Sequence, residues 1–270
     1  MQLGISTYTF GWSVGTPDNR PATYFTEFDL LKKAEQFALH LVQFGDNLPL
    51  HSLPSERLSA LQQQARQKHI SLEIGARGLT ENHLSIYIEL AQQLDSRLLR
   101  FVIDGKAYEP GLEEIIAVIK SHVPQLEKHH ITLGLENHDR LKAREFANII
   151  EKIASPHVGI CLDSVNSMGA AEGLEQIVDI LAPYTVNLHI KDFGIRRLPH
   201  LMGFQIDGQP AGKGMLNIPW LIDKISPFNK CHTAILEQWV VPENNLQQTI
   251  QKEQAWAEES INYLKPYFQA

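Results

Sequence analysis

Four side chains that can ligate a metal ion stand at the ends of four successive apolar runs in the second half of the chain. They are Glu136 in ITLGLEN, Asp163 in VGICLDSVN, His189 in VNLHIKD and Glu237 in AILEQW. Each run has the Val, Ile and Leu content of a buried parallel strand, which delivers its last residue to one rim of a barrel. Three carboxylates and one imidazole that meet on this rim form an oxygen-rich site, which suits Mn²⁺, Mg²⁺, Co²⁺ or Zn²⁺. The residues therefore predict a site for one divalent metal ion.

The elements that must position these residues alternate from end to end of the chain. Strand-like runs lie near residues 2–8, 41–45, 70–76, 98–103, 131–136, 157–163, 185–191 and 233–239. Amphipathic helical patterns lie at 27–39, 55–68, 81–95, 111–129, 142–154, 173–182, 217–226 and 245–266. Eight strands alternating with eight helices predict an α/β fold, a single (β/α)8 TIM barrel domain over residues 1–270. A doubly wound sheet is the alternative, but the turn after the first strand, TYTFGWSVGTP, lacks the GxGxxG pattern.

The charge balance argues against a nucleic-acid partner. The 270 residues include 24 Lys and Arg against 31 Asp and Glu, which gives a net charge of −7. A protein that binds nucleic acid normally needs a basic stripe to displace counterions from phosphates. The hydrophobic fraction of 43% is enough to bury a sizeable core. We therefore expect a small-molecule partner.

Neither a signal peptide nor a membrane span is evident in the sequence. The first residues, MQLGISTYTF, begin directly with a strand pattern, and no apolar run approaches the length of a membrane span. Cys161 and Cys231 lie in apolar runs, where they are expected to be small buried hydrophobes in a reducing compartment. The sequence thus predicts a cytoplasmic protein that does not associate with a membrane.

Two long connections are expected on the rim where the four ligands emerge, because the βα loops of a barrel share one face. Residues 193–216 form an irregular stretch, and a loop of this length commonly acts as a lid over a site. Residues 9–26 carry Phe10 and Trp12, which can wall one face of a sugar, although aromatic residues near a rim are as commonly part of the packing.

The segments LEN, LDSVN, HIKD and ILE, together with PAGKGMLNIPWLI, resemble the xylose isomerase-like TIM barrel superfamily. This superfamily includes sugar phosphate isomerases and epimerases, the endonuclease IV-type enzymes (AP endonuclease family 2), dehydratases and decarboxylases. The resemblance covers nearly the whole chain. It implies one divalent ion held by Glu136, Asp163, His189 and Glu237. It also implies that the two glutamates face each other across the substrate and exchange a proton with carbon, while the metal polarises the carbonyl.

The chain departs from the superfamily in two places. Where many epimerases have Asp-x-x-His after the sixth strand, this chain has Asp163-Ser-Val-Asn166. Asn166 can hydrogen-bond a substrate hydroxyl but cannot shuttle protons. The endonuclease branch needs extra histidines on early strands, whereas the second and third strands here end in VQFGD and EIGAR. DNA repair is therefore not expected.

Lys191 follows His189 by two residues, so in a strand both side chains point to the same face, into the barrel mouth. We expect its ammonium to be catalytic, by stabilising an enolate or gripping a carboxylate; the alternative is a brace for Asp163. Asn137 and His138 follow the fifth strand, and because consecutive residues alternate faces, one of them is expected to approach the substrate and the other to brace the site.

Arginines offer guanidinium forks that match a carboxylate or phosphate on the substrate. Arg77 ends the third strand pattern and is expected to point into the barrel mouth. Arg100 stands early in RFVID, where a buried structural ion pair is the favoured interpretation. Arg196 and Arg197 lie on the long connection, and one of them is expected to contact the substrate, unless both are simply solvated.

The favoured function is a divalent-metal-dependent isomerase or epimerase that acts on a sugar or sugar-derived hydroxy-ketone through an enediolate. The alternative is a metal-dependent lyase of the same fold, either a decarboxylase of a 3-oxo sugar acid or a keto-polyol dehydratase. A non-catalytic sugar- or metal-binding barrel is the second alternative. A homodimer is expected, because exposed aromatic residues such as Trp256 or Tyr267 would fit an interface, although packing of the last helix explains them equally well.

Overall fold

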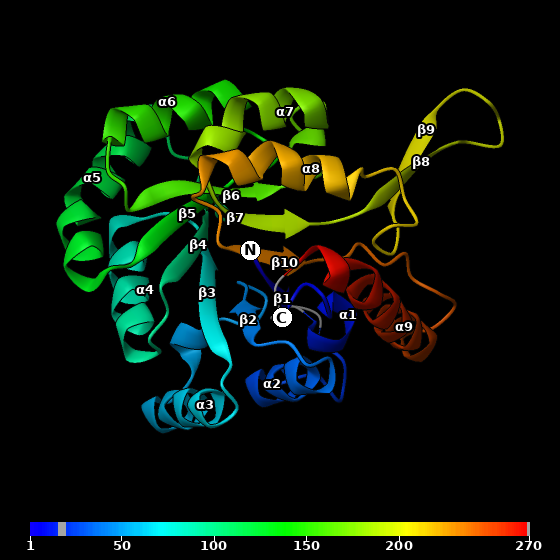
Figure 1. The fold of residues 1–270 in the computed structure, drawn as a ribbon, viewed down its shortest axis with the longest axis horizontal. Helices are drawn as coiled ribbons and strands as arrows, with labels where there is room; N and C mark the ends of the chain where they lie inside the picture. The colour runs from blue at the N-terminus through cyan, green and yellow to red at the C-terminus, as the bar shows by residue number, and fades with distance from the viewer. Residues whose placement is uncertain (16–19, 269–270) are drawn as a thin grey trace.

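A closed barrel of eight parallel strands forms the centre of the protein (Figure 1). The structure is a computed structural model that describes residues 1–15 and 20–268. The strand order around the barrel is β1-β10-β7-β6-β5-β4-β3-β2. The barrel strands are β1 (Gln2–Ser6), β2 (Leu41–Phe44), β3 (Ser71–Arg77), β4 (Leu98–Val102), β5 (Thr132–Glu136), β6 (Val158–Asp163), β7 (Thr185–Ile190) and β10 (Thr233–Leu236).

Helices surround the barrel in the alternation that the sequence predicts, so the predicted TIM barrel is confirmed. They are α2 (Glu27–Gln36), α3 (Ser55–Gln67), α4 (Glu81–Gln93), α5 (Leu112–His129), α6 (Ala143–Ile153), α7 (Leu174–Leu181), α8 (Ile218–Ile225) and α9 (Leu246–Leu264). Short 3₁₀ turns are η1 (Leu50–Ser52), η2 (Asn166–Met168), η3 (Ala182–Tyr184), η4 (Ser226–Phe228) and η5 (Lys265–Tyr267). None of the described helices is long and apolar enough to cross a membrane.

The apolar faces of the helices pack on the outside of the barrel. In α6 the buried residues Phe146, Ile149, Ile150 and Ile153 recur at helical spacing and form one stripe. Strands covered by helices outside and by side chains inside are buried on both faces, which explains their nearly continuous apolar runs. This packing holds the C-terminal ends of the strands in one ring, where each can present a polar residue to the same space.

The first connection contains an element that the sequence analysis did not predict. Within residues 9–26, the one-turn helix α1 (Gly11–Val14) follows β1. Residues 16–19 of the predicted loop lie outside the described residues. The turn into α1 directs Phe10 into the core, where its ring lies 5.7 Å from that of Phe25.

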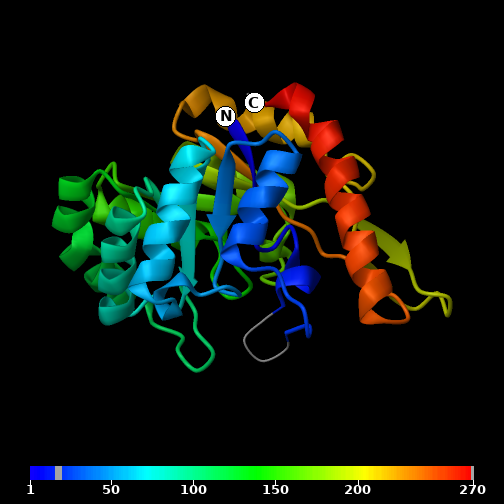
Figure 2. The same cartoon turned by 90° about the horizontal axis from the view of Figure 1, so that it is seen from below.

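The stretch 193–216 was predicted to be irregular, and for residues 193–208 this prediction is wrong. Strands β8 (Phe193–Arg197) and β9 (Phe204–Gly208) form an antiparallel hairpin that projects from the barrel (Figures 1 and 2). Apolar residues stand two positions apart in both strands, at Phe193 and Ile195 in β8 and at Phe204 and Ile206 in β9, which is the period of a β-strand. The buried carboxylate of Asp192 holds the root of the hairpin. It accepts hydrogen bonds from the backbone N–H groups of Gly212 (2.9 Å), Gly214 (3.0 Å) and Leu216 (3.0 Å).

Candidate active site

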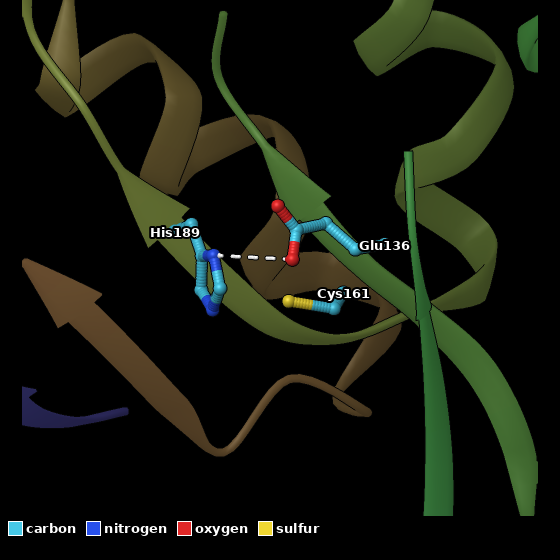
Figure 3. A group of neighbouring side chains, drawn as sticks. All are labelled: Glu136, Cys161 and His189. Carbon is cyan, nitrogen blue, oxygen red and sulfur yellow. Dashed lines mark ion pairs between the residues drawn. The ribbon is translucent and has the colours of Figure 1, made fainter. Parts of the chain in front are cut away.

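The four predicted ligands meet inside the mouth of the barrel. Glu136 ends β5, Asp163 ends β6, His189 lies one residue before the end of β7, and Glu237 directly follows β10. The Nδ1 atom of His189 lies 3.8 Å from Glu136 Oε2, 3.9 Å from Asp163 Oδ2 and 3.5 Å from Glu237 Oε1. All four side chains are at most 2% exposed. In Figure 3 the carboxylate of Glu136 and the imidazole of His189 face each other, with Cys161 beside them.

The hydrogen bonds of His189 leave Nδ1 free to ligate. Its Nε2 atom donates a hydrogen bond to Gln43 Oε1 at 2.7 Å, since a carboxamide oxygen can only accept. In the neutral imidazole, Nδ1 then carries a lone pair. This buried atom has no hydrogen-bond partner among the described residues. A lone pair buried among three carboxylates fits a bound divalent cation, which would satisfy it.

Asp163 is arranged in the same way. Its Oδ1 atom accepts the backbone N–H groups of Val165 (2.8 Å) and Asn166 (2.9 Å), which fixes the carboxylate. Its Oδ2 atom is buried and makes no well-aligned hydrogen bond within the described chain, although Lys191 Nζ lies 2.9 Å away. One oxygen is thus held by the backbone and the other faces His189, as a metal ligand requires.

Glu136 is held between a guanidinium and an amide. Arg100 Nε pairs with Glu136 Oε2, and Asn166 Nδ2 donates to Glu136 Oε1 at 2.8 Å. Arg100 is itself buried, and its register partners on the neighbouring strands are Gly75 and Gly134. A Cβ atom on Gly75 would lie 3.0 Å from Arg100 Cδ, so this glycine leaves room for the long side chain. The expected buried ion pair of Arg100 is therefore present, and its partner is one of the predicted metal ligands.

Lys191 lies in the same cluster, as its spacing from His189 predicts. Its ammonium is 2.9 Å from Asp163 Oδ2 and 3.1 Å from Glu237 Oε2. Burial lowers the pKa of Lys191, but the negative charges of Asp163, Glu237 and Glu136 raise it by more, so the net direction is upward. Burial raises the pKa of Glu237, but His189, Lys191 and Arg100 lower it by more, to about 2. The ammonium and this carboxylate both remain charged at neutral pH.

A cavity of about 220 Å³ opens above the ligands and is lined by Glu136, Glu237, Lys191, Asn166, Arg77 and His138. Arg77 lies at its mouth, where Nε is 3.2 Å from Asp46 Oδ2 and Nη2 is 3.2 Å from His138 Nε2. His138 thus approaches the cavity. Asn137 braces β6 instead, because its amide bonds the backbone of Asp163 at both N–H (2.7 Å) and C=O (3.0 Å).

Three residues predicted to bind substrate lie outside this cavity. Phe10 is in the core. Trp12 lines a separate apolar pocket and donates from Nε1 to the backbone oxygen of Val240 at 2.8 Å. Arg196 lies on the exposed hairpin, where its Nε is 3.1 Å from Asp207 Oδ2. The hairpin projects outward instead of folding over the mouth as a lid (Figure 1), and the substrate roles predicted for these three residues stay predictions.

Other residues reach the cavity without having been singled out as candidates. Tyr8 lines it, and Asp46 holds Arg100 Nη1 at 2.9 Å. Asp46 could have been identified from the sequence, because it follows the end of β2 closely, as Glu237 follows the end of β10. Burial raises the pKa of Asp46, but Arg100 and Arg77 lower it by more, so this carboxylate stays ionised.

Cys161 is the alternative ligand that the geometry offers, because its Sγ lies in a group with Glu136 and His189. The thiol donates to Asn187 Oδ1 at 3.0 Å, below the level of the carboxylates. Burial raises the pKa of Cys161, and Glu136 raises it further. The thiol is therefore protonated in the structure, and the group of Asp163, His189 and Glu237, with Glu136 beside them, is the better oxygen-rich site.

Comparison with known proteins identifies the family of this chain. The profile of the xylose isomerase-like TIM barrel family matches residues 33–267. The chain belongs to this family. This chain is 32% identical over 264 residues to the 3-oxo-isoapionate decarboxylase of Pectobacterium atrosepticum, and the match covers 98% of this chain and 95% of that protein. The family resemblance expected from the sequence is thus confirmed.

Solved structures share the fold of this xylose isomerase-like barrel. A xylose isomerase-like TIM barrel protein from Mycobacterium smegmatis in complex with magnesium superimposes with a TM-score of 0.71 at 13% identity, covering 97% of each chain. The D-psicose 3-epimerase of Clostridium cellulolyticum H10, solved with D-tagatose, superimposes with a TM-score of 0.71 at 14% identity, covering 100% of each chain. Relatives of this family are thus enzymes of more than one reaction class, and the reaction of this chain must be argued from its site.

Proposed function

We propose that this protein is a divalent-metal-dependent decarboxylase of a 3-oxo sugar acid. The full-length similarity to the 3-oxo-isoapionate decarboxylase carries the proposal. The chemistry of the cavity supports it, because Asn166 stands where an epimerase would use a proton-shuttling histidine. The order of preference from the sequence, with an isomerase or epimerase first, is therefore reversed.

The reaction breaks the bond between C2 and the carboxyl carbon of the substrate. The electron pair of that bond moves into the C3 carbonyl, which gives an enolate and CO₂, and C2 then takes up one proton. A divalent ion held by Glu136, Asp163, His189 and Glu237 supplies, when bound, positive charge that stabilises the developing oxyanion. The residues of the chain must orient the substrate, stabilise the same oxyanion and deliver the proton.

Lys191 is suited to two of these tasks. Its ammonium lies in the wall of the cavity, 5.1 Å from the centre of the Trp239 ring, and it stays charged at neutral pH. From this position it donates a hydrogen bond to the enolate oxygen and then a proton to C2, after which water reprotonates the amine. Asn166 donates a hydrogen bond from Nδ2 to Glu136, and its Oδ1 atom lies 3.4 Å from Lys191 Nζ. The amide thus holds the carboxylate of Glu136 and the ammonium of Lys191 in fixed positions.

The placement of cations matters in a decarboxylation, because the carboxylate loses its charge as CO₂ leaves. A cation that grips the carboxylate stabilises the ground state and slows the reaction, whereas a cation at the oxyanion stabilises the transition state. Both Lys191 and Arg77 line the cavity, but Lys191 is only 5% exposed, whereas the side chain of Arg77 is 35% exposed and lies at the mouth. We assign Arg77 to attracting the anionic substrate and Lys191 to the chemical step.

The experiment is turnover of 3-oxo sugar acids by the Mn²⁺-loaded protein in D₂O, followed by NMR with detection of CO₂. Release of CO₂ with one deuteron delivered to the vacated carbon is the expected result. Deuterium on the carbon beside the carbonyl of a ketose, with an isomeric product and no CO₂, would establish an isomerase or epimerase instead. The observation that favours an isomerase or epimerase as the second candidate is that Glu136 and Glu237 both line the cavity.

A matched variant separates an enzyme from a binding protein. Glu136→Gln preserves the shape of the side chain but removes its charge. For an enzyme, this variant loses turnover while a ligand still raises its melting temperature. If the barrel only binds sugar, the wild-type protein and Glu136→Gln would show the same ligand-induced rise in melting temperature, and neither would turn the substrate over.

A further inference from the structure

The hairpin formed by β8 and β9, called the arm below, exposes an apolar face and an apolar tip. Ile195 pairs with Ile206 and Arg197 with Phe204, so these four side chains lie on one face. The fractional exposures in the arm are 43% for Ile195, 67% for Leu201, 88% for Met202, 61% for Phe204 and 41% for Ile206. The other face is polar, because Arg196 bonds both Asp207 (3.1 Å) and Gln205 (2.7 Å). A two-stranded hairpin with an uncovered apolar face is marginally stable in water and marks an interaction site.

An apolar pocket of about 500 Å³ lies at the base of the same arm. Its walls include Trp12, Val240, Leu246 and Trp239, with Ile206 of β9 on the side of the arm. The base of the arm is close against this wall, since a Cβ atom on Gly208 would clash with the backbone oxygen of Trp239. The chain therefore carries an apolar projection and an apolar recess side by side.

We propose that two copies of this chain form a twofold-symmetric dimer by exchanging their arms. When two identical arms lie antiparallel along each other, the tip of each one must meet the base of the other. Leu201 and Met202 of one copy then enter the pocket beside Trp239 of the second copy, and the apolar faces of the arms cover each other. Ten exposed side chains and two pockets leave water together, enough for an interface near the lower end of the specific range, about 1,200 Å² in total.

Charge also favours a second copy as the occupant. Arg197 has no carboxylate within ion-pair distance in the described parts of the chain, and its guanidinium lies 4.4 Å from the centre of the Phe204 ring. The segment that borders the pocket, between Val241 and Leu246, carries Glu243, whose side chain is 42% exposed and pairs with Lys252 Nζ at 2.7 Å. The arm of a second copy brings the guanidinium of Arg197 to the open side of this carboxylate.

The proposed dimer reaches the metal cavity through one side chain. Trp239 lines both the apolar pocket and the cavity above the ligands. The tip of the second copy packs on the outer side of this indole, whose ring lies near the ammonium of Lys191. Each copy thus completes the wall of the active site of the other.

The first experiment measures mass by sedimentation equilibrium at micromolar concentration. The chain has a mass of 30.5 kDa, and we expect the wild-type protein to have twice this mass. Met202→Asp places a charge at the most exposed position of the tip and is expected to give a monomer with an unchanged circular dichroism spectrum. Ile86→Asp is the matched control, because Ile86 is an exposed apolar residue on α4, and it should remain dimeric. A monomeric wild-type protein would overturn the proposal.

The second experiment tests the contact itself. The native cysteines are both buried, so Met202→Cys and Leu246→Cys each add a single exposed thiol. Under oxidising conditions the two variants, mixed, should form a disulfide-linked heterodimer, whereas each variant alone should not. A dimer that forms no such link and survives Met202→Asp would show that another surface joins the copies. Neither readout uses turnover, so this proposal fails or stands independently of the decarboxylase activity.

Discussion

His189 Nε2 lies 2.7 Å from Oε1 of Gln43, an oxygen that can only accept a hydrogen bond. Gln43 is held in turn, because its amide nitrogen donates to Glu73 Oε2 at 3.0 Å and to Asn187 Oδ1 at 3.2 Å. The amide cannot rotate without losing these bonds. The interior of the barrel below the site thus selects the tautomer of His189 whose Nδ1 lone pair faces the three carboxylates.

Replacement of Gln43 by Leu should weaken metal binding without touching a ligand. The variant removes the acceptor that orients the imidazole, and loss of such a partner typically costs about 10- to 100-fold in metal affinity. Titration calorimetry with Mn²⁺ measures the change. Urea unfolding of the metal-free variant is the control for a general loss of structure. An unchanged affinity would mean that Gln43 does not select the tautomer.

The ligand set predicts an order among three variants. Glu237→Ala and Asp163→Asn each remove a carboxylate that faces His189, and we expect both to lose the bound ion during gel filtration. Asn166→Ala removes only a hydrogen bond to Glu136, so it should retain most of the metal. Elemental analysis after loading with Mn²⁺ measures the content of each variant. Better retention by Asp163→Asn than by Asn166→Ala would contradict the assignment of β6.

Lys191→Met should lower kcat by about 100- to 1,000-fold, the usual loss when one donor to a developing oxyanion is removed. The metal content should be retained, because the lysine is not a ligand. Arg196→Met is the comparison, since its side chain is 57% exposed and lies outside the cavity. This variant should keep the wild-type kcat. A large loss of kcat in Arg196→Met would support the substrate role that the sequence predicts for Arg196.

Glu73 should make the metal-free protein less stable as the pH rises. Burial raises the pKa of Glu73 from its ordinary value of 4.5 to about 7. The folded state keeps a proton that the unfolded state releases, so the stabilisation is complete below pH 4.5 and is lost as the pH rises to about 7. A shift of this size corresponds to about 3 kcal/mol.

Glu73→Gln removes this titration and should reduce the slope of the unfolding free energy against pH between 5 and 8. The slope that remains is due to Glu253, because burial also raises the pKa of Glu253 to about 7. Urea unfolding at several pH values measures the slope. The exposed Glu56, replaced in the same way, is the matched control and should leave the slope unchanged. A variant of Glu73 with the wild-type slope would place the titration in another group.

The ends of the strands could be predicted from sequence because their chemistry is local. A run of β-branched residues that ends in Asp, His or Glu identifies both the strand and the residue at its rim, and a parallel barrel brings such rims together. Lys191 was predicted for the same reason, through the two-residue period of a strand. Arg100 is different, because its contact with Glu136 depends on the register of β4 against β5, which no local pattern reveals.

Side chains on connections could not be placed from sequence. Phe10 and Arg196 both lie in segments whose direction depends on tertiary packing. A one-turn helix sends Phe10 into the core, and hairpin pairing sends Arg196 outward, away from the mouth. The alternation of apolar and polar residues in 193–208 was a strand signal, but the expectation of an irregular lid concealed it.

The carboxylate of Asp192 has a consequence for how this protein can change over time. It accepts four backbone hydrogen bonds, one from Phe193 at the start of the arm and three from the segment that follows the arm, and it lies one residue after the catalytic candidate Lys191. This anchor separates substitutions farther out in the arm from the lysine of the same chain. Within one chain the arm is therefore a modular unit, and a change in its length or charge acts instead on the proposed dimer and on the Trp239 wall of the second copy.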